Sequence, residues 1–254
     1  QNAFVLNAYG ENLAINSGYR EFHRSPHHKG WTWQTKSKNA VLIDGKGEAT
    51  QNMKASGRIT TYETGARFTR ATGDATAAYQ TEQPDGRVKA VLRDLVFVDK
   101  RYVVIRDRVT LATPGKLTWL LHAERPIEWR AADATALIRA EKATLTTRLL
   151  AVGATTWNAK VQAKFDVPVD PKYTKGDVAG FGKTGAWGEQ SHLFAETAEA
   201  RAEHVVYAVL WPERDGFPSK PLAARLTPTG ALQIARPDGK TDTLTLGDAS
   251  VKVE

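Results

Sequence analysis

Residues 19–47 hold more chemically active side chains than any other part of the sequence. Three of the six histidines and two of the seven tryptophans fall here: His23, His27, His28, Trp31 and Trp33. Five cations are interleaved with them: Arg20, Arg24, Lys29, Lys36 and Lys38. Imidazole transfers protons near neutral pH, indole stacks on ligand rings, and Lys or Arg pairs with anions. A loop of this kind between two strands is a typical position for binding chemistry.

A structural interpretation of the same stretch stays open. Trp31 and Trp33 can form a packed corner surrounded by solvated cations, although such a corner has no need of three histidines. Neighbouring side chains of an extended chain point to opposite sides, so at most one of His27 and His28 should face a site. Asn39 adjoins a strand, and its alternative role is a turn hydrogen bond.

The elements that must position this loop are β-strands, because apolar and β-branched runs alternate with turn signals along the chain. The clearest are residues 88–98 and 102–111, which flank the hairpin-like connection Asp99-Lys100-Arg101. Arg106 and Arg108 alternate with apolar residues, as expected for a half-buried strand. Further strands are predicted at residues 3–15 (two short ones), 40–44, 66–73, 116–124, 136–141, 144–152, 192–198, 203–211 and, as a hairpin around Pro237-Asp238-Gly239, 231–246.

The strand spacing and the lack of long helical periodicity predict an all-β protein, a large antiparallel β-supersandwich with little helix. Residues 1–254 form one such domain, in which the residues after about 212 can form a small C-terminal sheet. Residues 168–190 are a long Pro- and Gly-rich loop, which is more often functional than idle. The other histidines, His122, His192 and His204, are predicted in strands. Four further tryptophans fit core or edge packing: Trp119, Trp129, Trp157 and Trp211.

The composition narrows the class of function. The formal net charge of +7 and pI of about 9.5 favour a polyanionic partner. Nucleic acid is not predicted, because no binding motif or dense Lys/Arg run is visible, whereas an acidic polysaccharide also suits the Trp and His content. No apolar run is long enough to span a bilayer. The absence of cysteine excludes disulfides and thiolate metal sites. There is no phosphate-binding glycine loop, Ser/His/Asp elbow or HExxH motif.

The segments FVLNAYGENLAINSGY and SPHHKGWTWQTKSKNAVLIDGKGE, followed later by LVFVDKRYVVIRDRV and WLLH, resemble the C-terminal β-sandwich half of heparinase II/III-like polysaccharide lyases. Alginate and oligo-alginate lyases of related families share this half. The resemblance covers most of the chain, most specifically residues 4–47 and 91–122. It implies a periplasmic or secreted protein whose sandwich works with a preceding helical toroid domain or subunit, which this chain is expected to lack.

The resemblance also implies a structural zinc in many members, with ligands in the motifs that read AINSGY and SKNAVLIDG here. Asn16 and Lys38 occupy the ligand positions of those two motifs. A neutral amide is a poor substitute for a carboxylate on zinc, and an ammonium cannot ligate. We therefore predict that the zinc site is lost and that no cofactor is present.

In this family the reaction removes the C5 proton of a uronic acid and expels the 4-O-glycan. The catalytic candidates here are His27 and His28, as base or carboxylate neutraliser. The substrate-binding candidates are Arg20, His23, Trp31, Trp33, Lys36 and Asn39. The predicted function is the sandwich portion of a lyase that cleaves uronate-containing polysaccharide by β-elimination and is inactive as this chain alone. The alternative is a non-catalytic glycan-binding or structural module.

Overall fold

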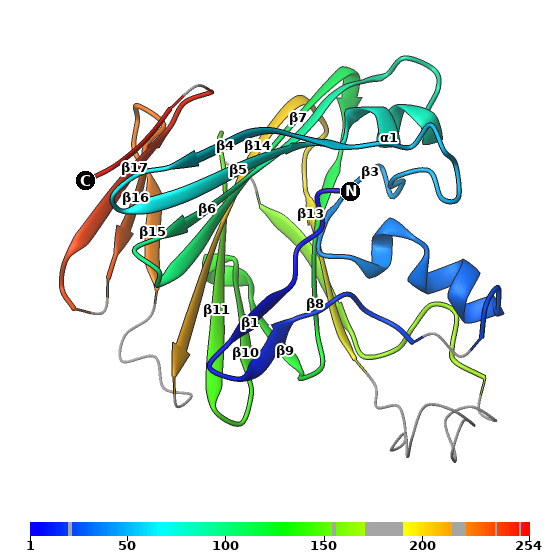
Figure 1. Cartoon of the computed structure of the whole chain (residues 1–254), viewed down its shortest axis with the longest axis horizontal. Helices are drawn as coiled ribbons and strands as arrows, with labels where there is room; N and C mark the ends of the chain where they lie inside the picture. The colour runs from blue at the N-terminus through cyan, green and yellow to red at the C-terminus, as the bar shows by residue number, and fades with distance from the viewer. Residues whose placement is uncertain (20–21, 154–155, 171–189, 215–221, 237, 249) are drawn as a thin grey trace.

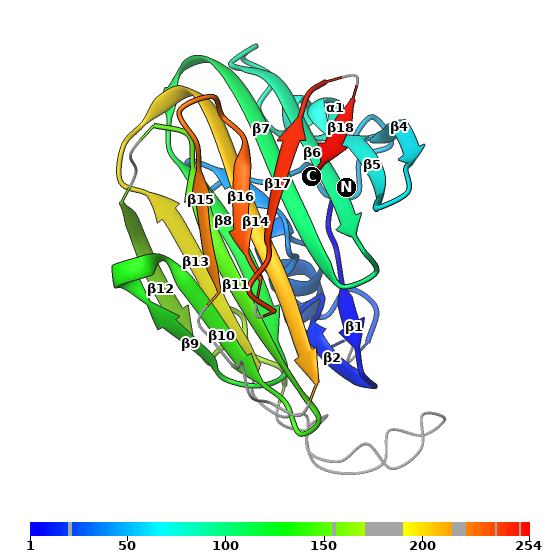
Figure 2. The same ribbon diagram turned by 90° about the vertical axis from the view of Figure 1, so that its left-hand side faces the viewer.

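The computed structural model describes residues 1–19, 22–153, 156–170, 190–214, 222–236, 238–248 and 250–254. Arg20, most of the predicted 168–190 loop and Pro237 therefore lie outside the described residues. The described chain forms 18 strands, all antiparallel where they pair, and one short α-helix, so the predicted all-β supersandwich is confirmed. None of its helices is long and apolar enough to cross a membrane. Three sheets lie in layers, as Figures 1 and 2 show.

The middle layer is an eight-stranded sheet with the strand order β4-β5-β6-β7-β14-β11-β10-β9. Its strands are β4 (Arg58–Thr64), β5 (Phe68–Asp74), β6 (Val88–Val98), β7 (Tyr102–Gly115), β9 (Ile127–Arg130), β10 (Thr135–Arg139), β11 (Ala143–Ala151) and β14 (Arg201–Arg214). The predicted hairpin between β6 and β7 is confirmed. Asp99 and Lys100 adopt φ values of 50° and 53° at its turn, a conformation that Asp and Asn tolerate better than most residues.

A four-stranded sheet packs on one face of the middle layer, with the order β12-β13-β8-β3. It consists of β3 (Val41–Ile43), β8 (Leu117–Ala123), β12 (Trp157–Gln162) and β13 (Ser191–Thr197). Its inward residues, including Trp119, Leu121, Leu193 and Ala195, join those of the middle sheet in the larger of two hydrophobic cores. The N-terminal hairpin of β1 (Leu6–Ala8) and β2 (Glu11–Ala14) also packs against this core.

The C-terminal strands form a sheet of their own on the opposite face of the middle layer (Figure 2). They are β15 (Ala223–Leu226), β16 (Leu232–Ala235), β17 (Thr241–Leu246) and β18 (Val251–Val253). Leu232, Ile234 and Leu244 meet Tyr102 and Trp211 in the second hydrophobic core. The middle sheet is therefore covered on both faces, which explains why β7 carries an almost unbroken run of buried residues.

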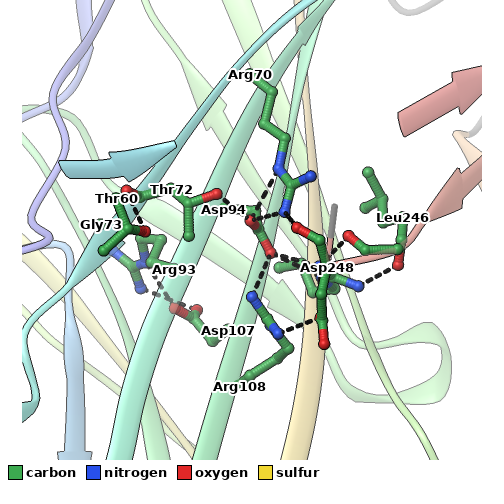
Figure 3. A network of polar contacts seen from close by, with 12 residues as sticks. Thr60, Arg70, Thr72, Gly73, Arg93, Asp94, Asp107, Arg108, Leu246 and Asp248 are labelled. Atoms are coloured by element: carbon green, nitrogen blue, oxygen red, sulfur yellow. Dashed lines mark hydrogen bonds and ion pairs between the residues drawn. The ribbon is translucent and has the colours of Figure 1, made fainter. Parts of the chain in front are cut away.

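Buried charges also join the middle sheet to the C-terminal sheet (Figure 3). The Asp94 carboxylate is fully buried and accepts hydrogen bonds from Arg70, Thr72 and Arg106 at 2.6–3.1 Å. Arg70 and Arg106 in turn donate to backbone carbonyls just after β17 and at its end, those of Asp248, Gly247 and Leu246. The sequence predicted Arg106 on the polar side of a half-buried strand; this was wrong, because the C-terminal sheet covers that side.

The short helical features of the described chain were not predicted. The helix α1 (Thr76–Glu82) stands between the predicted strands at residues 66–73 and 88–98, where the sequence predicted no helix. Residues 19–47 were predicted as a loop, but they contain the π-helical turn η1 (His28–Thr32) and the 3-10 helix η2 (Thr35–Ser37). This segment lies beside the four-stranded sheet, in blue at the right of Figure 1.

Candidate functional site

The turn that leads into η1 is held by local hydrogen bonds. The Ser25 hydroxyl accepts the backbone N–H of His28 at 3.0 Å, and the His28 Nδ1 accepts the backbone N–H of Arg24 at 3.1 Å. Arg24 itself has a φ of 65°, in the left-handed region. Because these bonds fix the backbone, His27 and His28 sit on a helical turn and not on an extended segment, and they contact different parts of the protein.

A cluster of three rings, His23, His28 and Trp33, lies at the surface of this segment. The ring centroids of His28 and Trp33 are 4.6 Å apart, and His23 is 5.6 Å from His28 and 5.9 Å from Trp33. His23 is exposed and Trp33 is half-buried, whereas His28 is buried beneath them. The neighbouring Arg24 and Lys29 are also exposed, so the cluster has cations beside it. This is where imidazole, indole and positive charge reach solvent together.

His27 has a different environment. Its side chain is fully buried, its Nδ1 donates to the Val167 carbonyl at 2.6 Å, and its Nε2 accepts the backbone N–H of Tyr19 at 3.1 Å. The Phe165 ring lies 4.8 Å from it. These bonds occupy both ring nitrogens and fix a neutral tautomer, so the geometry suits a positioning role. The catalytic role that the sequence suggested for His27 stays a prediction.

Trp31 is fully buried, which favours the packed corner over the stacking platform for this residue. Its indole N–H donates to the Ser17 hydroxyl at 3.1 Å, and its ring lies 4.9 Å from His192 and 5.6 Å from Phe165. Gly18 makes this packing possible, because at its φ of 97° an added Cβ would stand 2.6 Å from Trp31. Trp33 is the tryptophan of the two that solvent reaches.

His122 and His192, predicted as strand residues, form a buried pair under Trp31. Their Nδ1 atoms are 3.1 Å apart, and the Nε2 of His122 lies 3.2 Å from the Lys38 carbonyl. A carbonyl can only accept, so the His122 proton is on Nε2. The His122 Nδ1 therefore accepts a hydrogen bond, and the His192 Nδ1 donates it. Burial lowers the pKa of His122 to about 3, with the neighbouring His192 adding to the effect, and burial lowers that of His192 to about 4. Both rings are neutral at physiological pH.

Asn39 is fully buried and acts as a connector between segments. Its amide nitrogen donates to the carbonyls of Phe4 and Ile15, at 2.8 and 3.0 Å, and its side-chain oxygen accepts the backbone N–H of His122 at 2.8 Å. Its own carbonyl accepts from Arg93 at 2.6 Å. The side chain thus joins the N-terminal segment to β8, and its part in substrate binding stays a prediction.

Lys36 is partly exposed and lies at the far end of the segment from His23. Its ammonium pairs with Asp166 at 2.7 Å and stands 5.6 Å from the centre of the Trp31 ring. A substrate carboxylate would have to share this lysine with Asp166. Arg20, its predicted companion, lies outside the described residues, so the structure does not relate the two.

Asn16 and Lys38 stand at the positions where the resemblance implies zinc ligands, and the loss of that zinc site stays a prediction. Lys38 is half-buried, burial lowers its pKa, and within the described part of the chain it makes no ion pair. Among the described residues, no carboxylate lies close enough to pair with the Lys38 ammonium. These residues also contain no group of three His, Cys, Asp or Glu side chains that could hold a metal.

The segment 165–170 is the part of the site that the sequence did not reveal. Phe165 contacts the rings of Tyr19, His27, Trp31 and His192, and the Val167 carbonyl accepts a hydrogen bond from the His27 ring. More than a hundred residues separate it from the loop that it supports, and its sequence, FDVPVD, has no signal for that contact. Gln190 supports the loop from a second direction, since its side chain accepts the backbone N–H of Gly18 at 2.7 Å.

Comparison with known proteins gives a family and several structures. The family described as "Heparinase II/III-like, C-terminal" matches residues 1–169. The structure of a heparan sulfate lyase, HepC, from Pedobacter heparinus is similar, with a TM-score of 0.68 and 15% identity over 95% of this chain. A structure of heparinase III has a TM-score of 0.70 and 14% identity, again over 95% of this chain.

This chain spans only about a third of each of those proteins, 35% in both cases. At these identities the likeness is one of fold. No curated protein matches the sequence. The further resemblance to alginate lyases, expected from the sequence, stays a prediction.

Proposed function

Because the chain belongs to the heparinase II/III-like C-terminal family, we propose that it is the β-sandwich portion of a lyase that cleaves uronate-containing acidic polysaccharide by β-elimination. The observation that carries the proposal is the surface cluster of His23, His28 and Trp33 with Arg24 and Lys29 beside it. It lies in one of the two segments that most resemble the family. The net charge of +7 is consistent with an acidic substrate.

The elimination needs three groups around one sugar. The carboxylate must be neutralised, a base must take the C5 proton, and an acid must protonate the leaving 4-oxygen. In our proposal Trp33 gives the sugar ring an apolar face, and the exposed cations beside the cluster, Arg24 and Lys29, attract the carboxylate. Lys36 and Arg20 stay candidates that the sequence alone suggested. His23 and His28 supply imidazole at the sugar. His27 holds the backbone at Tyr19 and so positions the loop.

The remaining groups would come from a helical toroid, as a domain or a partner subunit. Losing one member of an acid, base and neutraliser set typically costs about two to four decades of rate. We therefore expect these 254 residues alone to release no measurable unsaturated product, but to bind acidic glycans weakly. Such a substrate is a polymer outside the cytoplasm, so we place the protein in the periplasm or outside the cell; cell fractionation would test this.

We also propose that the domain works without zinc, because Asn16 and an ammonium at Lys38 stand at two of the ligand positions. Elemental analysis of the purified chain decides this. We expect well under one zinc per chain, and a stoichiometric ion that survives dialysis would contradict the proposal.

The function is tested by pairing a turnover assay with titration calorimetry on the chain, using alginate, heparin and hyaluronan at low and high salt. We expect no product, and a dissociation constant between roughly micromolar and millimolar that weakens with salt. Trp33→Ala should weaken binding about threefold to tenfold. Tyr62→Ala, an exposed aromatic on the edge strand β4, is the matched control and should bind as the wild type does.

Three outcomes separate the alternatives. Turnover on adding a helical toroid encoded beside this chain would establish the lyase. Binding that depends on Trp33 but never leads to elimination with such a partner would favour the non-catalytic glycan-binding module. Binding that ignores salt and Trp33 would show that the cluster is not the glycan site.

A further inference from the structure

The outer face of the four-stranded sheet carries an ordered set of side chains that the proposed function does not use. Residues opposite each other on neighbouring strands share a face, and alternate residues along a strand return to it. On this face Phe194 of β13 stands between Lys160 of β12 and Leu120 of β8. In the next row Glu196 stands between Asn158 and Thr118.

One end of this face is covered and the other is open. The row that contains His192 and His122 is packed under Trp31 and Phe165. Beyond that row is a groove of about 350 Å³, a volume in the range of small-ligand sites. The side chains in it that matter here are Asn158, Lys160, Gln162, Asp166, Phe194 and Glu196. None of them belongs to the cluster of His23, His28 and Trp33.

The groove combines a partly exposed ring with polar groups and an excess of positive charge. Phe194 is half-buried in its floor, while Asn158 and Lys160 on the edge strand β12 are exposed. At its rims Asp166 pairs with Lys36 at 2.7 Å, and Glu196 pairs with Lys116 at 3.1 Å. Among the described residues Lys160 makes no ion pair within 4 Å, although its charge acts on Asp166 from farther away. Three lysines therefore face two carboxylates.

The rim is partly fixed before any ligand arrives. The Gln162 amide donates to the Asp166 Oδ1 and to the Lys164 carbonyl, both at 3.1 Å, and Asp166 holds Lys36 through its other oxygen. A hydroxylated ligand would therefore meet carboxylate and amide groups in set positions, and only the Lys160 ammonium would gain an ionic partner. This arrangement suits a ring with an apolar face, hydroxyls at its edge and one negative charge.

We propose that this groove is a second saccharide subsite, which binds a uronate unit away from the site of chemistry. The sugar ring lies on Phe194, its carboxylate pairs with Lys160, and its hydroxyls bond to Asn158 and Glu196. The choice of a uronate rests on the proposed function; the existence of the groove does not. A long acidic glycan could then contact the domain at two places, the loop cluster and this sheet face.

The test is titration of the isotopically labelled chain with a uronate tetrasaccharide prepared from alginate, followed by NMR. We expect amide shifts in β12 and β13 around Lys160 and Phe194. Lys160→Gln should weaken this binding about twofold to fivefold, and Phe194→Leu by about threefold to tenfold. Lys89→Gln, which removes an exposed strand lysine of the eight-stranded sheet, is the matched control and should change neither the amide shifts nor the affinity for the tetrasaccharide.

Maltotetraose, a neutral probe, should bind more weakly than the uronate, and Lys160→Gln should not affect it. Equal binding of both sugars would overturn the acidic specificity, and the absence of shifts in β12 and β13 would overturn the subsite. Shifts at Trp33 without shifts at Phe194 would reject this inference and leave the proposed function standing. Shifts at Phe194 without any at Trp33 would support the subsite and count against the proposed catalytic cluster.

Discussion

At the scale of single residues, the buried pair of His122 and His192 makes stability depend on pH. Unfolded histidine titrates near pH 6.5, whereas the folded pKa values are about 3 and 4. A lowered folded pKa gives stability that is fully present above pH 6.5, is lost progressively as the pH falls below 6.5, and is gone once the pH has passed the folded values. Each histidine should therefore contribute about 2 kcal/mol less at pH 5 than at pH 7. Thermal unfolding measured across this range checks the prediction.

The matched variants for that experiment are His192→Gln and His23→Gln. His192→Gln removes one buried imidazole, so its stability should fall less steeply between pH 7 and pH 5. His23 is exposed, so His23→Gln should keep the wild-type profile. Lys38 and Asp166 are the charged groups that act on the pair, and they have opposite effects. If the stability of wild type and of His192→Gln falls equally steeply between pH 7 and pH 5, the pair does not cause the loss of stability in acid.

Asn39 is predicted to be essential for folding. Asn39→Ala would leave the carbonyls of Phe4 and Ile15 and the N–H of His122 without their partner in a buried region. Leaving buried polar groups unpaired costs roughly 1–3 kcal/mol each, so the three groups together should lower the free energy of unfolding by about 3–9 kcal/mol. Urea denaturation measures it, with the exposed Asn7→Ala as the control, expected within about 0.5 kcal/mol of wild type. A well-folded Asn39→Ala with weakened glycan binding would instead support the binding role.

At the scale of elements, Asp94 of β6 connects two strands to the C-terminal sheet. It pairs with Arg70 of β5 and Arg106 of β7, and both arginines bond to the end of β17 or the residues just after it. Burial alone would raise its pKa, but the Thr72 hydroxyl and the Arg106 guanidinium lower it, so the carboxylate stays ionised. Asp94→Ala would leave Arg70 and Arg106 buried without their counter-ion. Breaking a buried pair in this way typically costs about 3–5 kcal/mol.

Calorimetry should show this loss as a clear fall in Tm. Asp133→Ala is the control, because its pairs with Arg130 and Arg148 are partly exposed and such pairs are worth about 0–1 kcal/mol. An Asp94→Ala variant as stable as Asp133→Ala would mean that the arginines find other partners.

The sequence predicted most strands but not the helices, because the strands have local sequence signals and the helices depend on contacts between residues far apart in the sequence. Strands such as β6 and β7 are encoded locally by β-branched runs with a turn between them, so pattern alone found them. The helix α1 is seven residues long and begins without a side-chain cap, so it has no strong local signal. Its Tyr79 is buried with its hydroxyl on the Val41 carbonyl at 2.6 Å, a contact that only the folded chain provides.

The candidate site shows the same limit. The sequence located the segment and its active side chains, but it could not tell which of them reach solvent. His27 and Trp31 are buried because Phe165 and Val167 return to cover them, and ten strands of the two large sheets, β3 to β12, separate those residues from the loop in the sequence. Trp33 and His23 stay accessible because nothing in the described chain covers them to the same degree. Their roles in binding stay predictions that the experiments above address.

At the scale of the whole molecule, the C-terminal sheet is predicted to be part of the folding unit. It covers Val98, Tyr102, Val104, Val209 and Trp211 on the middle sheet, all of them buried. A chain that ends after Arg214 would expose this apolar face, so it should aggregate or bind a hydrophobic dye such as ANS. The full chain should give one cooperative transition. A soluble, cooperatively unfolding truncated chain would show that the sheet is dispensable.

Because β7 and β14 lie side by side in the middle sheet, their backbone amide hydrogens should be the last to exchange with solvent. Their residues from Val103 to Val109 pair with those from His204 to Leu210, with a packed layer on each face. Deuterium can replace these amide protons only when both layers separate, so their exchange should report global unfolding. The amides of β4, an exposed edge strand, need no such event. Hydrogen–deuterium exchange followed by mass spectrometry should therefore label β4 early and the β7–β14 pair last.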